Sequence, residues 1–151
     1  MTLGERCIEE AIRLHVFLEG WLVGRLARTP ETFAAFADAL SDACEVISPL
    51  GSVTGRGDLL PEFEATHGVL ADSADIFAIR VENARVLRAW PDHALVTYEE
   101  WHDLGNDTSA RLSTALYLAD PAAPLGVSWR HILETWLPGR APKGGERFPT
   151  A

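Results

Sequence analysis

The feature that most constrains this chain is a change in the spacing of its apolar residues near residue 75. Before that point, apolar residues recur every three or four positions, which is typical of amphipathic helices. After it, apolar and polar residues alternate over long segments, which indicates half-buried strands. Helices followed by a run of antiparallel strands predict an α+β fold, with the helices packed on one face of a curved sheet.

Helical spacing covers most of the chain before the change. A long helix is expected over residues 4–27. Its apolar stripe consists of Ile8, Ala11, Ile12, His15, Leu18, Leu22 and Leu26. A shorter helix follows, because Thr29 can cap a helix that begins with Pro30. Asp58 can cap a third helix, and residues 44–48 predict a short strand between the second and third helices.

Alternating polarity predicts the later strands. They are expected over residues 76–90, 94–103, 109–118 and 127–137. The Gly-Asn turn at residues 105–106 favours a hairpin that places Glu99 opposite Leu112 on the next strand. The preceding turn places Ala84 opposite Glu99, with a bend or bulge expected at residues 82–84.

One face of these strands is interpreted as the inner face, toward the helices, because its residues are largely apolar or small. Glu99 and His131 are polar members of this face. A buried carboxylate and imidazole need a reason, and a ligand cavity is the leading one, so both residues are predicted to be catalytic, as a general acid and base. The predicted ligand-binding residues are Trp21, Thr97, Trp101, Thr114 and Trp129. The alternative is that Glu99 reaches the rim or a backbone amide and that His131 is a packing residue.

The opposite face is interpreted as the outer face, suited to solvent or to a second subunit. The predicted dimer-interface residues are Tyr98, Glu100, Arg111, Ile132, Glu134 and Trp136. Arg111 falls between Glu100 and Glu134 on neighbouring strands. This arrangement is interpreted as a set of cross-strand ion pairs in preference to an anion site.

Composition and motifs exclude several classes of function. The formal net charge of -9, from 22 acidic and 13 basic residues, would repel nucleic acid. Lys143 is the only lysine, so Schiff-base chemistry has no good candidate. Neither H-x-x-x-H nor H-E-x-x-H occurs, so a metal site has little support. Cys7 and Cys44 lack a C-x-x-C spacing, and no signal peptide or long apolar span precedes them, so a reduced cytoplasmic setting away from membranes is expected.

The chain resembles the nuclear transport factor 2-like superfamily, and within it the bacterial proteins related to SnoaL-like polyketide cyclases and ketosteroid isomerase. The resemblance covers about residues 5–138 and rests on Trp21 and on several short motifs. These motifs are ISPLG at 47–51, VTYEEW at 96–101, STAL at 113–116 and WRHILETW at 129–136.

This resemblance implies a cystatin-like, cone-shaped barrel, in which a strongly curved antiparallel sheet wraps around the long first helix and two further helices. It implies a nuclear transport factor 2-like domain, expected as the single domain over residues 1–138, and a homodimer that forms through the outer sheet face. Residues 139–151 are rich in Pro, Gly and Arg and are expected to form a flexible tail. The expected function is a cavity for a small apolar ligand. Three readings stay open: a cofactor-free isomerase, dehydratase or cyclase that moves protons on a carbonyl compound, a non-catalytic ligand-binding or dimeric module, and a domain whose core fills the cavity.

Overall fold

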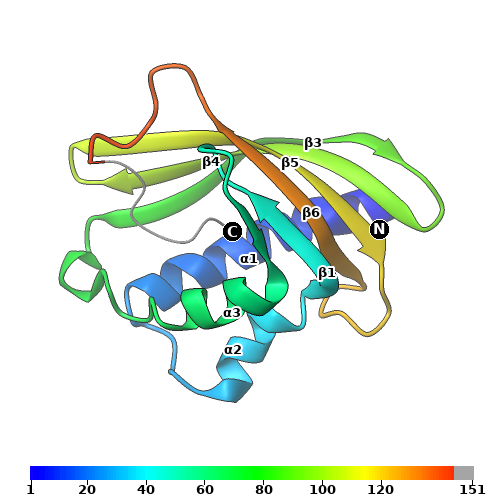
Figure 1. The fold of residues 1–151 in the computed structure, drawn as a ribbon, viewed down its shortest axis with the longest axis horizontal. Helices are drawn as coiled ribbons and strands as arrows, with labels where there is room; N and C mark the ends of the chain where they lie inside the picture. The colour runs from blue at the N-terminus through cyan, green and yellow to red at the C-terminus, as the bar shows by residue number, and fades with distance from the viewer. Residues whose placement is uncertain (145–151) are drawn as a thin grey trace.

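The computed structural model describes residues 1–144, which form three α-helices and a six-stranded sheet (Figure 1). The helices are α1 (Leu3–Leu22), α2 (Pro30–Ala37) and α3 (Arg56–Glu64), with a short 3-10 helix at Ala71–Ser73. The strands are β1 (Leu40–Ile47), β2 (Val53–Gly55), β3 (Phe77–Ala89), β4 (His93–Leu104), β5 (Asp107–Ala119) and β6 (Val127–Trp136). The α+β class, the long first helix and the two further helices are therefore as the sequence predicts.

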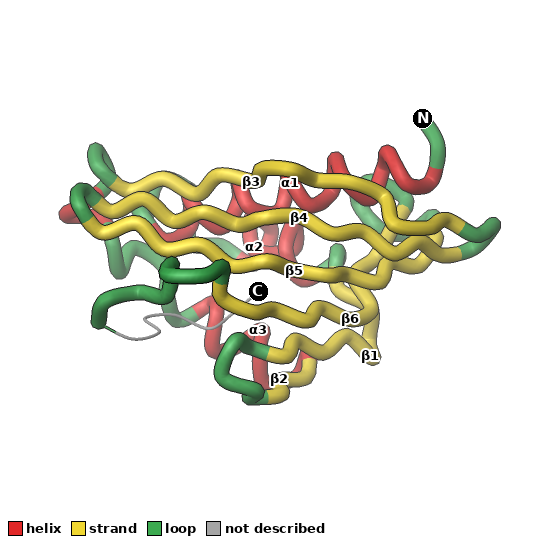
Figure 2. The backbone as a smooth tube through the Cα atoms, turned by 90° about the horizontal axis from the view of Figure 1, so that it is seen from above, coloured by secondary structure: helices red, strands yellow, loops and turns green. Residues whose placement is uncertain are grey.

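The strands form one open sheet in the order β2-β1-β6-β5-β4-β3 (Figure 2). All neighbouring strands are antiparallel except β1 and β6, which are parallel. The sheet is therefore mixed and does not close into a barrel, whereas the sequence predicted an antiparallel sheet. Helix α1 packs on β3, β4 and β6 and α3 packs on β1 and β2, so the helices cover one face and leave the other uncovered.

Helix α1 begins with a capping box in which the Thr2 hydroxyl accepts from the Glu5 amide and the Glu5 carboxylate accepts from the Thr2 amide. At the other end of α1, Trp21 is fully buried and donates its indole N–H to the Phe63 carbonyl at 3.2 Å. Its ring lies 5.6 Å from that of Phe17 and belongs to an aromatic core between the helices. Trp21, which was predicted to bind a ligand, therefore packs inside the protein core.

The β4–β5 register is the predicted one, since Glu99 lies opposite Leu112. The β3–β4 register differs, because Glu82 and not Ala84 lies opposite Glu99. The predicted bulge is present, with a register shift between Glu82 and Arg85. A second shift between Val86 and Arg88 was not predicted, and the two irregularities together displace the pairing.

The prediction of the inner and outer faces is wrong. Tyr98 and Glu100 are 0% and 2% exposed beneath α1, whereas Leu112, on the face with Glu99, is 38% exposed. The inner face also contains Arg111, Ser113, Ile132 and Glu134, all of which are buried. The polarity of alternate residues was too similar on the two faces to assign them, and helix α1 packs on the more charged face.

A bulge in β6 separates two residues that were predicted to share a face. Trp129 lies opposite Tyr117 and His131 lies opposite Leu116, with a register shift between the two pairs. Trp129 is consequently fully buried on the inner face, while the His131 side chain is only partly buried and lies 3.1 Å from Glu45 on β1. The prediction assumed uninterrupted alternation along β6, and one extra residue breaks that alternation.

The chain after β6 turns back along β5. The Leu137 amide donates to the Ala110 carbonyl at 3.0 Å, and the Ala110 amide donates to the Arg140 carbonyl at 2.9 Å. The first residues of the predicted tail therefore extend the backbone pairing of the sheet. Residues 145–151 of that tail lie outside the described residues.

Candidate functional site

A chain of three polar side chains runs from α1 to the edge of the inner face. Glu100 lies at its centre, with one carboxylate oxygen 2.7 Å from His15 Nε2 and the other 2.5 Å from His102 Nε2. His15 Nδ1 lies 2.6 Å from the Ala11 carbonyl oxygen. Both nitrogens of His15 thus face acceptors, so the ring donates from both and is an imidazolium when Glu100 is ionised.

The pKa values of His15 and Glu100 depend on their burial and on each other. His15 and Glu100 are 1% and 2% exposed. Burial by itself would lower the pKa of His15, but the charge and hydrogen bond of Glu100 outweigh it and raise that pKa. Burial would raise the pKa of Glu100, but His15 and Arg111, together with the hydrogen bonds of the two histidines, hold it well below its usual range.

Arg111 and Glu134 form a second buried pair beside this chain. Arg111 Nη1 lies 3.4 Å from Glu134 Oε1, and the guanidinium lies 4.8 Å from the centre of the Trp136 ring. Burial raises the pKa of Glu134 to about 7, although Arg111 opposes the rise, while Glu100 adds to it. The predicted ion pair between Arg111 and Glu134 is confirmed, but the pair lies inside the protein and not on an outer surface.

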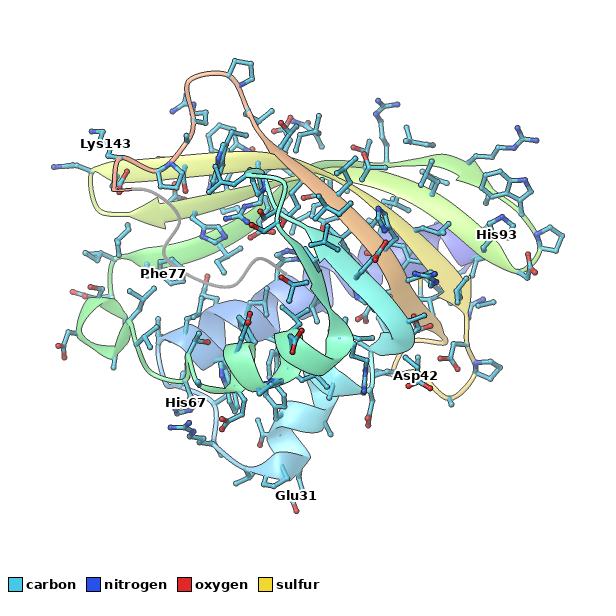
Figure 3. All side chains as sticks on the ribbon, in the orientation of Figure 1. Glu31, Asp42, His67, Phe77, His93 and Lys143 are labelled. Carbon is cyan, nitrogen blue, oxygen red and sulfur yellow. The ribbon has the colours of Figure 1, made fainter. Side chains whose placement is uncertain are left out.

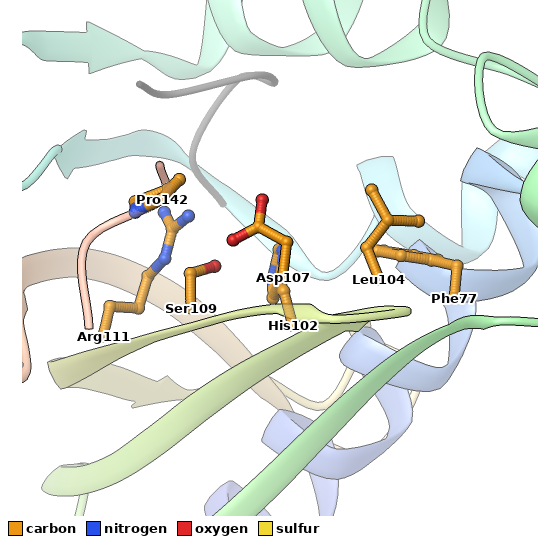
Figure 4. Close-up of a pocket in the computed structure, with 7 residues that line it drawn as sticks. All are labelled: Phe77, His102, Leu104, Asp107, Ser109, Arg111 and Pro142. Atoms are coloured by element: carbon orange, nitrogen blue, oxygen red, sulfur yellow. The ribbon is translucent and has the colours of Figure 1, made fainter. Parts of the chain in front are cut away.

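A small pocket opens beside these residues. It is lined by Phe77, His102, Leu104, Asp107, Ser109, Arg111 and Pro142 (Figure 4). Its volume of about 20 Å³ is room for little more than one water molecule. His102 connects the pocket to Glu100 and His15, and Arg111 connects it to Glu134. Pro142 belongs to the segment that follows β6 and lies beside Arg111 at the pocket.

The two predicted catalytic residues are not brought together. Glu99 lies on β4 and His131 on β6, with β5 between them, on the face away from α1. Glu99 accepts a hydrogen bond from the Trp101 indole N–H at 3.0 Å, and His131 lies near Glu45. Their predicted acid and base pairing rested on the wrong face and loses its geometric basis.

The predicted ligand-binding residues are also dispersed. Thr97 is buried and donates to the Ser113 carbonyl at 2.9 Å, and Thr114 lies opposite it on the uncovered face. Trp101 has the guanidinium groups of Arg80 and Arg140 each 5.1 Å from its ring centre. Trp129 donates its indole N–H to Glu10 at 3.1 Å in the core. The residues that line the pocket include none of the five predicted residues.

The predicted dimer-interface residues need the same correction. Tyr98, Glu100, Arg111, Ile132 and Glu134 are each 5% exposed or less, because they lie on the inner face of the sheet. Trp136 is only partly buried, beside Arg111. Five of the six side chains therefore pack within the protomer and cannot form the surface of a dimer.

Sequence reasoning missed the roles of His15 and His102. The sequence analysis counted His15 in the apolar stripe of the first helix and gave His102 no role. The sequence nevertheless contained a sign of this cluster. His15 interrupts the apolar stripe of the first helix, and Glu100, Arg111 and Glu134 were already predicted to share one face of the sheet. Burying any one of these charged groups alone would cost much free energy, so groups of opposite charge are expected to pair inside the protein.

Three further findings concern the described residues. Across residues 1–144, no group of three or more His, Cys, Asp or Glu side chains is arranged to hold a metal ion. Over the same residues, no helix has the length and apolar character to cross a membrane. Cys7 and Cys44 are free thiols, and burial raises their pKa values to about 11 and about 12, which suits packing residues better than nucleophiles.

Known sequences resemble most of the chain. The family model described as Sucrose-6-phosphate phosphohydrolase C-terminal matches residues 8–138. Sucrose-phosphatase 2 from Nicotiana tabacum is 22% identical over 133 residues, and Sucrose-phosphatase 1 from the same plant is 21% identical over the same length. Each alignment covers 87% of this chain, but the chain spans only 31% of the length of each relative.

Solved structures resemble the fold. An NTF-2 like protein of unknown function from Pseudomonas aeruginosa has a TM-score of 0.74 and 22% identity, covering 87% of this chain and 98% of that one. The CaMKII hub of S. rosetta has a TM-score of 0.60 and 15% identity, with coverage of 91% and 98%. A protein of unknown function with a cystatin-like fold from Nostoc punctiforme has a TM-score of 0.60 and 12% identity, with coverage of 89% and 90%.

The structural neighbours confirm the fold, and the family model extends from residue 8, within α1, to just beyond the end of β6. The chain therefore belongs to the sucrose-6-phosphate phosphohydrolase C-terminal family, and its fold is that of nuclear transport factor 2-like proteins, as its sequence resemblance predicted.

Proposed function

We propose that the chain binds a small carbonyl compound in the pocket at His102 and Arg111 and transfers protons on it without a cofactor. His102 is the acid and base, Glu100 positions it, and Arg111 stabilises the negative charge that develops on the carbonyl oxygen. The proposal keeps the chemistry expected from the sequence but moves it from Glu99 and His131 to the inner face.

The observation that carries the proposal is the His15, Glu100 and His102 chain, which begins under α1 and reaches the pocket. Burying these groups costs free energy, and apolar residues of similar volume would often be more stable. Such a cost is commonly retained where a site needs a base held in a fixed orientation.

The proposed step is a reversible proton transfer. While His102 Nε2 donates to Glu100, Nδ1 is the basic nitrogen of the ring and takes a proton from the carbon next to the substrate carbonyl. The electron pair of that C–H bond moves to the carbonyl oxygen, which becomes an enolate oxyanion beside Arg111. Return of the proton to a carbon or to the oxygen regenerates the neutral ring and completes the exchange.

The pocket volume implies movement before substrate binds. About 20 Å³ cannot hold an organic compound, and Pro142 is the pocket residue that comes from the segment after β6. Displacement of that segment would enlarge the pocket without disturbing the β4–β5 hairpin. The proposal therefore includes opening of the segment that carries Pro142.

Deuterium exchange tests the proposed function. A panel of small ketones is incubated in heavy water with the protein, and loss of the proton signal next to the carbonyl is followed by nuclear magnetic resonance. Wild-type protein is expected to accelerate exchange of at least one ketone, and His102→Gln is expected to reduce that rate by about 100-fold or more. Asp72→Asn, an exposed change outside the pocket, is the matched control. Exchange that persists in the folded His102→Gln variant would refute the assignment.

A second function, homodimerisation, is proposed for the uncovered sheet face. Leu112 and Leu133 lie on the neighbouring strands β5 and β6 and remain 38% and 48% exposed. Thr114, which pairs with Leu133, lies between them on the same face. Exposed leucines side by side on a sheet favour contact with a second copy of the chain. The sequence predicted a dimer through the face that carries Tyr98 and Glu100, and the proposal moves the contact to the opposite face of the sheet.

Sedimentation equilibrium tests the dimer. Leu133→Glu is expected to convert a dimer to a monomer, because two charges would be buried at the symmetric contact. The matched control is Leu50→Glu, since Leu50 is 73% exposed in the loop after β1. A wild-type protein that is monomeric across the concentration range would contradict the proposal.

A further inference from the structure

The segment after β6, residues 137–144, runs along an edge of β5 and is called the strap below. β5 extends past the end of β6, so β6 does not cover its edge there. The strap occupies this edge through Ala110, whose carbonyl accepts from the Leu137 amide at 3.0 Å and whose amide donates to the Arg140 carbonyl at 2.9 Å. The strap is therefore joined to the strand that carries part of the pocket.

A turn directs the strap across this edge from one face of the sheet to the other. The Arg140 amide donates to the Leu137 carbonyl at 2.9 Å, and Gly139 between them has a φ of 70°, as the third residue of a type II turn requires. Arg140 lies on the uncovered face, with its guanidinium 5.1 Å from the centre of the Trp101 ring. Two residues later, Pro142 lies at the pocket on the inner face (Figure 4).

Few contacts hold the strap in this position. Its residues are exposed except Leu137 and Pro142, which are half-buried. Two backbone hydrogen bonds join it to Ala110, and one cation–π contact joins Arg140 to Trp101. Segments with so few buried apolar contacts open locally, without unfolding of the rest of the protein.

We infer that the strap is a gate for the pocket at His102, and that the contact between Arg140 and Trp101 is the latch that holds the gate closed. The inference rests on the proposed function, because it concerns access to the same site. Pro142 is the pocket residue that the strap supplies, so opening moves it away and leaves the other lining residues in place on β3, β4 and β5. A ligand that needs the open strap binds more weakly when the strap is rarely open.

The latch lies on the opposite face of the sheet from His102, so it can be weakened without a change in the pocket. Arg140→Gln removes the cation and keeps a polar side chain. Arg80, the other cation beside Trp101, is bound to Asp103 at 2.7 Å and remains to hold the ring. Loss of one exposed cation–π contact is expected to raise the open fraction of the strap about two- to fivefold.

Amide hydrogen exchange of the full chain tests the latch without any substrate. The Ala110 amide, which donates to the strap, is expected to exchange about two- to fivefold faster in Arg140→Gln. The Ala115 amide, on the part of β5 that lies between β4 and β6, is expected to keep its rate. An unchanged Ala110 rate, or an equal rise at Ala115, would overturn the latch.

Arg88→Gln is the matched control for this substitution. Arg88 makes the same kind of contact, with its guanidinium 5.0 Å from the centre of the Trp90 ring. His93 stacks on that ring at 4.3 Å, and Figure 3 shows His93 and Lys143 of the strap at opposite ends of the molecule. Arg88→Gln is therefore expected to leave the exchange of the strap contacts unchanged.

The rate at which diethyl pyrocarbonate modifies His102, followed by mass spectrometry, measures access to the pocket. This rate is expected to rise about two- to fivefold in Arg140→Gln and to keep the wild-type value in Arg88→Gln. Faster exchange of the Ala110 amide with an unchanged modification rate would overturn the gate, since the strap would then open without admitting a small molecule.

The same variants separate the gate from the proposed function. For a ketone whose deuterium exchange the wild-type protein accelerates, kcat/KM is expected to rise about two- to fivefold in Arg140→Gln. An unchanged kcat/KM would overturn the gate and leave the role of His102 intact. No accelerated exchange with any ketone would refute the proposed function, while amide exchange and modification of His102 would still decide whether the strap is a gate.

Discussion

Glu134 provides the sharpest test of the buried inner face. This residue is 3% exposed on the inner face of β6, and burial raises the pKa of its carboxyl to about 7. The Glu134→Gln substitution keeps the shape of the side chain but removes the ionisable group. The difference between the two proteins therefore isolates the effect of the Glu134 proton on folding stability.

The sign and size of the effect follow from linkage. An unfolded glutamate has a pKa near the ordinary value of 4.5, whereas the folded value is about 7. Between these two values the unfolded chain has released a proton that the folded protein retains, so the free energy of unfolding falls as the pH rises. The difference between the two pKa values corresponds to about 3 kcal/mol. Below pH 4.5 both states hold the proton, and above pH 7 both release it, so the change is confined to that window.

Urea unfolding at a series of pH values between 4.5 and 7 measures this effect. Wild-type protein is expected to lose about 3 kcal/mol more than Glu134→Gln across the window. Glu62→Gln, an exposed change on α3, is expected to follow the wild-type curve. Parallel curves for wild-type and Glu134→Gln would show that Glu134 is ionised throughout, and would refute the argument from burial.

Three further substitutions test other parts of the fold by urea unfolding. Gly24→Ala is expected to lower the free energy of unfolding by about 1–2 kcal/mol. Gly24 has a φ of 75°, and an added Cβ would lie 3.3 Å from the Gly68 Cα, so an unchanged stability would contradict this prediction. Glu100→Gln is expected to lower the free energy of unfolding by about 3 kcal/mol at pH 6, since the buried His15 loses its counter-charge. A loss below about 1 kcal/mol would indicate that His15 is neutral. Trp129→Phe is expected to lower the free energy of unfolding by about 1–3 kcal/mol, because the buried Glu10 loses an indole donor; equal stability would mean that Glu10 finds another donor.

The sequence predicted the local features of the fold well. The apolar stripe predicted α1, although this helix ends at Leu22 and not at residue 27, and Thr29 followed by Pro30 begins α2 as expected. The Gly-Asn turn at residues 105–106 predicted the β4–β5 register, because a two-residue turn allows only one pairing. These features depend on residues that are close in sequence, where conformational preferences act directly.

The faces of the sheet could not be predicted by the same reasoning. Residues 96–103 place Tyr98, Glu100 and His102 on one face and Glu99 and Trp101 on the other, so each face has apolar and charged members. The choice between them is made by contacts distant in sequence, in which His15 of α1 neutralises Glu100. Nothing within the strand itself shows that its more charged face is the buried one.

The residues of the candidate site were missed because of that choice and because of the bulge in β6. With the faces exchanged, the same alternation would have grouped Glu100, Arg111 and Glu134 on the inner face, opposite His15. Trp129 would then have been placed outside, although it lies in the core, because the register shift near residue 130 breaks the alternation. A bulge that no glycine or proline marks gives no signal in a single sequence.

The parallel pairing of β1 with β6 also affects how the chain folds as it leaves the ribosome. Leu40 pairs with Trp129, so β1 is synthesised early, while one of its two neighbouring strands emerges late. Until then Cys44 and Val46, which are buried in the folded protein, lack the strand that completes their layer. Contacts between segments so far apart in sequence slow folding and leave apolar surface and an unpaired strand edge exposed during translation. Nascent chains that end before β6 are therefore expected to bind molecular chaperones, and completed chains are expected to be released.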